Sequence, residues 1–331
     1  MDIPVELVAG KQAVELGLLA LPGVVGVGLG MREEGGEVFD ELAVRILVED
    51  SSQVPFGLPG DIAGIAVSIV ESRIEPCAFP DLARYDDLMG GVRVVQPLRG
   101  AGTLAVLVQD NGTGGAVGLS CQHVVGDPGQ QFPDTIWQPR EPNLVAPIPT
   151  DDNIGAVIRS DFPQTQPLPF SPVVVGMTDS AVLDLGAAVS TTGVPPRTLS
   201  AAVADQGPGL PPLVAAVTAT SAPEAGITRV RKRGFVTGVT AGLVIGRHLT
   251  VQWTLGGPRA FLMEQAEVLG DGVFCDTGDS GSLVLEETRP TAVGLLWGRS
   301  EATRFRAAGR IGVMSEIGNV ETALGISVVL P

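Results

Sequence analysis

The sequence predicts a mainly β protein: an antiparallel barrel or sandwich preceded by a small α+β unit. Short apolar, β-branched runs recur along most of the 331 residues, separated by turns that use many of the 44 glycines and 26 prolines. From residue 90 to about residue 300 no stretch keeps a helical period, which argues against a parallel sheet with alternating helices. The chain is also longer than the usual single domain, so one small and one large domain are expected.

The N-terminal unit begins with VELVAGKQAVELGLLAL, residues 5–21, where apolar residues recur at helical spacing before Pro22 and Gly23. We expect one helix there, followed by strands in VVGVGLGM, LAVRILVE and IAVSIVE. The GVGLG segment lacks the following helix and the Lys-Ser/Thr ending of a phosphate-binding loop, so it is interpreted as a glycine-containing strand. Residues 1–88 are therefore predicted to be a small α+β domain for docking, oligomerisation or regulation.

Residues 89–331 are predicted to form the second domain. Residues 139–172 and 207–226 are expected to be long loops, because they are rich in proline and small residues. One late helix is expected in MSEIGNVETALGI, with Ser315 or Asn319 as its N-cap and Gly325 after it. The expected strands are GTLAVLVQ, GAVGLSCQ, SAVLDLG, FVTGVTAG, LVIGRHLTVQW, SLVLE and TAVGLLWG.

Charge and cysteine content limit the function classes. A net charge of -16 opposes binding to nucleic acid. The one basic cluster, RVRKRG at 229–234, is expected to be a solvated strand edge, with a self-cleavage site or a patch for an anionic partner as the alternatives. No apolar run reaches the length of a membrane helix, and MDIPVELVAG lacks the positive start of a signal peptide. Cys77, Cys121 and Cys275 are widely spaced and fit reduced thiols. We therefore expect a cytoplasmic protein that binds neither nucleic acid nor membrane.

The segment CDTGDSGSLV, residues 275–284, is either a serine nucleophile on a strained turn or a glycine-rich hairpin. A serine nucleophile needs a base, and the chain has only two histidines. His248 alternates with strand residues in LVIGRHLTVQW and is expected to face solvent or cap the strand. His123, in SCQHVVGD, lies where a strand gives way to a loop, a place where a side chain is both anchored and accessible. His123 is thus the candidate base.

An acid that orients the imidazole is expected at the start of MTDSAVLDLG. Asp179 precedes the apolar residues of this strand, and Asp184 is its competitor. Strand alternation places the two carboxylates on opposite faces, so only one of them can face His123. We take Asp179 as the candidate, because a half-buried carboxylate fixes the tautomer better than a solvated one.

The order His123, Asp179, Ser280 and the segments around these residues resemble the trypsin-like serine peptidases. The resemblance is carried by CQHVV, by DSAV, and by GDSGSLV followed by VGLLWG. GTLAVLVQDNGTGGAVGLSCQHVV and VRKRGFVTGVTAGLV resemble more specifically an intracellular branch that includes the plant narrow-leaf protease and bacterial relatives. The resemblance covers about residues 90–331 and implies a chymotrypsin-like double antiparallel β-barrel.

The resemblance also assigns roles. Ser280 would attack a carbonyl carbon, His123 would accept its proton, and Asp179 would orient the imidazole. The N–H groups of Gly278 and Ser280 would form the oxyanion hole. Asp279 would point away from substrate toward a buried positive partner, which is either a side chain or an N-terminus made by processing.

The substrate pocket implied by the resemblance has Phe274 near its base and Trp297 and Gly298 in its walls. No acid occupies the Phe274 position, so a shallow apolar pocket without strong Lys/Arg preference is expected. Leu296 stands where relatives often carry serine. Cys121 and Cys275 are expected to be buried thiols, with a redox pair as the alternative. No metal-ligand spacing is present, so neither a metal nor another cofactor is expected.

The sequence therefore predicts a serine endopeptidase that cleaves protein or peptide substrates through an acyl-enzyme intermediate. The main alternative is a catalytically latent trypsin-like scaffold that binds a protein partner. A small-ester hydrolase is a third reading, because the same groups cleave esters. The leading domain makes a homo-oligomer possible, although the sequence contains no assembly motif.

Overall fold

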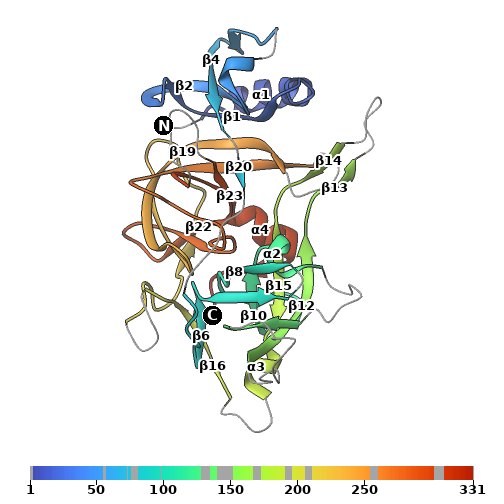
Figure 1. Ribbon diagram of the computed structural model, residues 1–331, viewed down its shortest axis with the longest axis vertical. Coiled ribbons are helices and arrows are strands. Elements are labelled where there is room, and N and C mark those ends of the chain that lie inside the picture. Colours follow the sequence, from blue (N-terminus) through green and yellow to red (C-terminus); the bar gives the residue numbers. More distant parts are fainter. Residues whose placement is uncertain are drawn as a thin grey trace.

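The structure is a computed structural model in which three parts are stacked along the longest axis (Figure 1). The N-terminal unit lies at one end, the sheet of the C-terminal half in the middle, and the sheet of residues 93–184 at the other end. The described residues are 3–54, 57–72, 74–75, 81–97, 99–127, 135–139, 152–166, 173–190, 196–205, 211–253, 260–301 and 309–330.

The N-terminal unit contains the expected helix and three expected strands. Helix α1 (Val5–Leu19) precedes the hairpin of β1 (Val24–Glu34) and β2 (Glu37–Val48). A 3-10 turn η1 (Ser51–Gln53) and strand β3 (Asp61–Ile62) then lead to β4 (Ile65–Glu71), which pairs parallel to β2. The apolar residues at the end of α1 share a core cluster with β1 and β2. The prediction of a helix followed by three strands is confirmed.

The GVGLG segment is part of β1, as predicted, and its glycines permit close contact with another strand. β1 pairs antiparallel with β19 (Gly238–Trp253), with Gly26 opposite Val251 and Gly30 opposite Gly246. A Cβ atom on Gly30 would lie 2.3 Å from the carbonyl oxygen of Ile245. The N-terminal hairpin therefore continues the sheet of the C-terminal half, and any larger residue at Gly30 would push the strands apart.

The C-terminal barrel is built from six antiparallel strands. Their order is β20-β23-β22-β21-β18-β19, and a further pairing of β19 with β20 closes the ring. The strands besides β19 are β18 (Arg229–Gly234), β20 (Ala260–Gly270), β21 (Leu283–Glu286), β22 (Thr291–Ser300) and β23 (Ile311–Glu316). Four short strands lie on its edges: β5 (Ile74–Glu75), β13 (Gln164–Gln166), β14 (Val173–Gly176) and β17 (Ala219–Thr220).

The other barrel is an eight-stranded sheet in the order β24-β9-β10-β15-β12-β11-β7-β8. A separate pair of β6 (Asp87–Gly90) and β16 (Thr198–Val203) lies beside it, with helices α2 (Gln122–Val125) and α3 (Gly186–Ser190) in its connections. The predicted mainly β, double-barrel fold class is confirmed. The eight strands are β7 (Arg93–Gln96), β8 (Gly100–Thr103), β9 (Val106–Asp110), β10 (Ala116–Ser120), β11 (Thr135–Trp137), β12 (Asn153–Asp161), β15 (Ser180–Asp184) and β24 (Ile326–Ser327).

Several boundaries differ from the sequence-based expectation. FVTGVTAG and LVIGRHLTVQW were expected as two strands, but residues 238–253 form the single long strand β19. The expected loop at 139–172 contains β12 and β13, because residues 153–161 find partners in β11 and β15. Glycine and proline therefore overstate the number of breaks in this chain.

Helix α4 (Ile317–Leu324) confirms the late helix, and Gly325 ends it in the left-handed conformation with φ of 62°. Its N-cap is Glu316, without a side-chain hydrogen bond, so neither predicted N-cap was correct. Ser315 belongs to β23, and its hydroxyl donates to Gln265 instead. No helix among the described residues is long and apolar enough to cross a membrane.

Candidate active site

His123 and Asp179 lie side by side in the residue 93–184 barrel. His123 sits in α2, directly after β10 ends, and Asp179 immediately precedes β15, which pairs with β10. One oxygen of the Asp179 carboxylate accepts the backbone N–H of His123 at 3.0 Å, and the other contacts Nδ1 of its ring. Asp179 is fully buried, whereas Asp184 is exposed and accepts from the N–H of Gly186. The structure thus places Asp179, not Asp184, beside the histidine.

The Ser280 loop is anchored to β8 of the same barrel. The N–H of Thr103 donates to the carbonyl of Ser280 at 2.8 Å, and its hydroxyl donates to the carbonyl of Gly278 at 2.8 Å. Gly278 and Gly281 have φ values of 107° and 93°, in the region that favours glycine. A Cβ atom on Gly281 would lie 2.1 Å from the carbonyl oxygen of Thr103. Both glycines are therefore required for this turn.

Two backbone donors remain available at this turn. Among the described residues, the N–H groups of Gly278 and Ser280 have no hydrogen-bond acceptor, while their carbonyl oxygens are held by Thr103. An oxyanion hole requires backbone N–H groups that are free to bind the oxygen of the substrate at the nucleophilic serine. The role predicted for these two groups remains a prediction.

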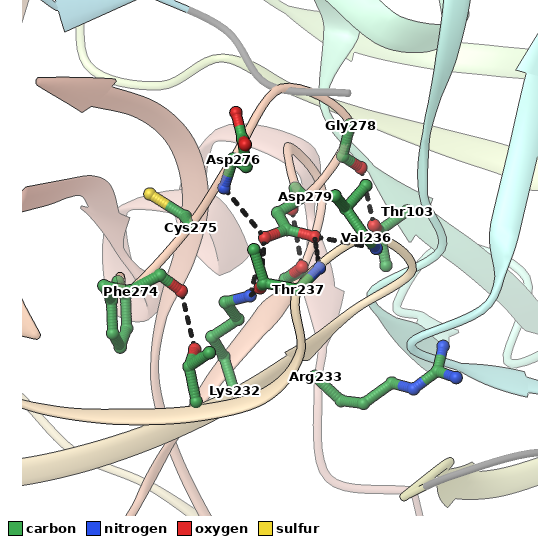
Figure 2. Close-up of polar contacts among 12 residues, drawn as sticks. Thr103, Lys232, Arg233, Val236, Thr237, Phe274, Cys275, Asp276, Gly278 and Asp279 are labelled. Atoms are coloured by element: carbon green, nitrogen blue, oxygen red, sulfur yellow. Dashed lines mark hydrogen bonds and ion pairs between the residues drawn. The ribbon is translucent and has the colours of Figure 1, made fainter. Parts of the chain in front are cut away.

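Asp279 is held by the chain's own side chains, as Figure 2 shows. Its carboxylate accepts from Lys232 Nζ at 2.7 Å, Thr237 Oγ1 at 2.6 Å and the N–H of Val236 at 3.0 Å. Lys232 and Asp279 are both fully buried. A Cβ atom on Gly234 would lie 2.0 Å from this carboxylate, so the approach of β18 depends on that glycine. The positive partner that the sequence left open is Lys232.

The RVRKRG segment is therefore not a solvated strand edge, and that expectation was wrong. It forms β18, which lies between β19 and β21 in the barrel. Lys232 points toward Asp279, whereas Arg233 extends away from it (Figure 2). Arg233 pairs with Asp81 at 2.6 Å. Both side chains are buried because each has a carboxylate partner.

The histidine segment and the serine loop meet on β22. The thiol of Cys121 donates to the carbonyl of Leu296 at 3.3 Å, and the N–H of Gly281 donates to the same oxygen at 2.7 Å. The hydroxyl of Ser280 donates to the carbonyl of Trp297 at 2.9 Å. Within the described part of the chain, no hydrogen bond joins this hydroxyl to His123. The Ser280 hydroxyl is thus hydrogen-bonded to the backbone of β22, next to the segment that carries His123.

Trp253 is a site residue that the sequence reasoning missed. Its ring centroid lies 5.1 Å from that of His123 and 5.1 Å from that of Trp297, and Phe162 packs edge-on at 5.4 Å. Trp253 ends β19 and lies outside the segments that carry the resemblance. The one available signal was its rarity, since the chain has only three tryptophans.

The predicted pocket residues are all buried. Phe274 is fully buried in the core of the C-terminal barrel, with Lys232 Nζ 5.9 Å from its ring centroid. Trp297 is 2% exposed and donates its indole N–H to Gln265 at 2.7 Å. Gly298 follows it in β22, where its carbonyl faces the thiol of Cys275 at 3.8 Å. Their role in lining a substrate pocket remains a prediction.

Cys121 and Cys275 are buried free thiols, as expected, and belong to two different apolar clusters; Cys77 lies outside the described residues. Potential ligand atoms of Cys121, His123 and Asp179 lie within 4.8 Å of one another. Metal binding would require a thiolate, but burial raises the pKa of the Cys121 thiol well above its ordinary value, and the Asp179 charge raises it further. Because Asp179 is already committed to His123, we interpret this cluster as a histidine–carboxylate pair.

The second histidine forms a different pair. His248 Nδ1 contacts the carboxylate of Glu264, and both residues are about one-fifth exposed. Their φ values, 51° and 57°, are unusual for residues other than glycine, and they lie where β19 and β20 shift register. The expected solvent-facing strand residue is therefore a half-buried partner of an acid.

Comparisons with known proteins gave matches only among solved structures. No family model and no curated protein matches the sequence. Thermobifida fusca protease A is similar with a TM-score of 0.48 and 17% identity over 74% of this chain and 100% of that one. Nocardiopsis protease has a TM-score of 0.48 and 18% identity, covering 73% and 99% of the two chains. Cellulomonas bogoriensis chymotrypsin has a TM-score of 0.47 and 17% identity, covering 74% and 100%.

Proposed function

We propose that the protein is a serine endopeptidase, with Ser280 as nucleophile, His123 as base and Asp179 as the acid that orients it. The observation that supports this most strongly is the meeting of two hydrogen-bonded systems on β22. Cys121, two residues before His123, and Gly281 of the Ser280 loop both donate to the carbonyl of Leu296, and Ser280 donates to that of Trp297. A nucleophile, a base with a buried acid, and two free N–H donors are the groups that acyl transfer requires.

Each of these groups has one role in the proposed reaction. The Ser280 hydroxyl turns from Trp297 toward Nε2 of His123, the ring nitrogen that Asp179 does not contact. As Oγ bonds to the carbonyl carbon, its proton passes to Nε2, and the N–H groups of Gly278 and Ser280 bind the oxyanion. The imidazolium then gives this proton to the leaving amine as the C–N bond breaks. Water, activated by the same histidine, hydrolyses the acyl-enzyme.

The buried Lys232–Asp279 pair supports activity without processing. In secreted trypsins the resemblance implies that a new N-terminus pairs with the acid beside the serine. Here Lys232 already provides that charge at 2.7 Å, and Thr237 and Val236 supply further hydrogen bonds. The loop is therefore shaped in the intact chain, which removes the main argument for latency.

We further propose that its substrates are neutral or apolar segments of proteins in a reducing compartment such as the cytoplasm. Phe274, where a carboxylate would select Lys or Arg, is an apolar residue packed in the barrel core. Cys121 and Cys275 are both free thiols. The net charge of -16 disfavours encounters with acidic partners.

A catalytically latent scaffold that binds a protein partner remains the second candidate. The observation that favours it is the hydrogen bond from Ser280 to Trp297, which holds the hydroxyl away from His123. A peptidase must break this bond at little cost, whereas a latent scaffold would retain it. The two functions therefore differ in how fast Ser280 reacts.

The test is covalent labelling of the full chain with a fluorophosphonate probe, with the adduct located by peptide mass. Rapid labelling at Ser280 that disappears in Ser280→Ala supports the proposal. Ser282→Ala is the matched control, because it removes a second buried hydroxyl from the same loop, one that donates to Asp279, and it should keep the adduct at Ser280. A folded protein that does not react would reject the peptidase and favour the scaffold.

A further inference from the structure

Trp253 packs directly on the proposed catalytic histidine. Its indole lies 5.1 Å, between ring centroids, from both His123 and Trp297, and only 8% of the residue is exposed. Asp179 fixes His123 through the backbone N–H and Nδ1, which leaves the faces of the ring to packing. The indole packs against the imidazole with an angle of 56° between the two ring planes. Carboxylate and indole together restrict both the position and the tilt of the imidazole.

The strand that carries Trp253 is held on both sides. On one side, Val251 lies opposite Gly26 of β1, in the N-terminal unit. On the other, Val251 lies opposite Leu262 and Trp253 opposite Ala260, both in β20. The pairing with β1 therefore reaches Val251, two residues before the end of β19, and the pairing with β20 continues to Trp253. Trp253 is thus the end of a strand that the N-terminal unit helps to fix.

Helix α1 adds a second attachment, three residues before Trp253. The hydroxyl of Thr250 accepts from Lys11 Nζ at 3.2 Å and donates to the carboxylate of Glu15 at 2.7 Å. Lys11 and Glu15 also form an ion pair, and all three residues are at most 2% exposed. Buried charges hold such contacts rigidly, because separating them leaves an unpaired charge without water.

We propose that Trp253 is a positioning residue for His123, and that the N-terminal unit keeps it in place through β1 and α1. The inference rests on the proposed function, since ring placement affects the reaction only if His123 is its base. It gives residues 1–71 a role in catalysis that needs no partner or second copy. The N-terminal unit acts on the site through β19.

The first experiment uses the fact that the chain has only two histidines. Two-dimensional NMR of the imidazole groups, assigned with His248→Ala, reports on His123 whether or not Ser280 reacts. The indole ring current shifts the His123 signals in the native protein, and Trp253→Leu should remove this shift and broaden them. Fluorophosphonate labelling should slow about tenfold to a hundredfold, the range expected when a catalytic group is displaced. Trp253→Phe, which keeps an aromatic ring, should restore most of the rate.

The second experiment tests the connection to the N-terminal unit. Lys11→Met with Glu15→Gln removes both buried charges near Thr250 and should slow labelling while shifting the His123 signals. Arg32→Met is the matched control, because Arg32 pairs with Glu34 and Glu41 in the same unit, near its surface. It should change neither readout. In the Trp253→Leu background the paired change should add little, because its route to His123 is already lost.

The outcomes separate this inference from the proposed function. Unchanged His123 signals and a labelling rate within about twofold in Trp253→Leu would overturn the positioning role. Equal effects of the Lys11/Glu15 and Arg32 changes would overturn the role of the N-terminal unit. A wild-type protein that is not labelled, but whose His123 signals respond to Trp253→Leu, would reject the peptidase and leave the positioning of the ring established.

Discussion

The protein contains two histidine–carboxylate pairs with the same contact and different surroundings. In both, Nδ1 faces a carboxylate oxygen: Asp179 for His123 and Glu264 for His248. Asp179 is fully buried and also binds the backbone of its histidine, whereas Glu264 is about one-fifth exposed and lies near Lys11. Of the two histidines, His123 is the one near the serine loop: Cys121, two residues before it, and Gly281 both donate to the carbonyl of Leu296.

The comparison shows that the same histidine–carboxylate contact occurs in two different structural settings. The second pair lies where β19 and β20 change register, with both residues at positive φ. Such conformations cost about 1 to 3 kcal/mol each and persist only where the surrounding structure requires them. We interpret the His248–Glu264 pair as support for the bend in β19, whereas the His123–Asp179 pair has the proposed role of holding a proton acceptor for Ser280.

The largest difference is expected when each histidine is removed. His123→Ala should reduce the rate of Ser280 labelling about ten-thousandfold, as the loss of a base does in such sites. His248→Ala should reduce it by less than about tenfold, because only the strand bend is disturbed. Stopped-flow labelling measures both rates. Similar losses in the two variants would mean that the pairs are not functionally distinct.

Removing Lys232 should have the next largest effect. Lys232→Met leaves the buried Asp279 carboxylate without its positive partner, which typically costs about 3 to 5 kcal/mol. The Ser280 loop should lose its conformation. The His123–Asp179 pair would then remain, but Ser280 would no longer be positioned to react. Urea unfolding and labelling, compared with Lys232→Met/Asp279→Asn, provide the measurement. The double variant should recover part of the stability; if it does not, the buried charge is not the cause.

Acid should affect the second pair in a defined direction. Burial raises the pKa of Glu264, but the hydrogen bond with His248 and the charge of Lys11 outweigh it, so the pKa lies below its ordinary value of 4.5. A lowered folded-state pKa contributes stability that is present above 4.5 and is lost as the pH falls through the folded value. Glu264→Gln should therefore be less stable than wild type at pH 7, and the difference in melting temperature should shrink below pH 4.5. A difference in melting temperature that stays constant across this range would mean that the charge of Glu264 does not contribute to stability.

Much of this structure could be predicted from local sequence. The helix before Pro22, the strand that begins at DSAV and the turn at GDSGS each follow from residues within a short window. Strand alternation allowed only one of Asp179 and Asp184 to face His123, the expected burial favoured Asp179, and the structure places Asp179 at His123. Local rules were enough wherever the deciding contact is close in sequence.

The remainder depends on contacts between distant segments. The sequence of RVRKRG is typical of a solvated strand edge. Its burial depends on Asp279, 47 residues away, which pairs with Lys232. Trp253 ends a strand that the sequence predicts, but no local pattern indicates that this strand end packs on His123. The attachment of the N-terminal unit depends on residues more than 200 positions apart, and no period or motif in the sequence reports such a pairing.

The pairing of β1 with β19 also constrains how the chain folds during synthesis. Lys11 and Thr250 are separated by 239 positions, which a ribosome adding about 5 to 20 residues per second covers in roughly 10 to 50 s. The β1–β2 hairpin can form early, but the edge of β1 stays unpaired until β19 has been synthesised. An unpaired strand edge invites pairing with another chain, so this interval is when the nascent protein is most exposed to aggregation. Glycines at 26, 28 and 30, which lower the β propensity of the waiting strand, reduce that hazard.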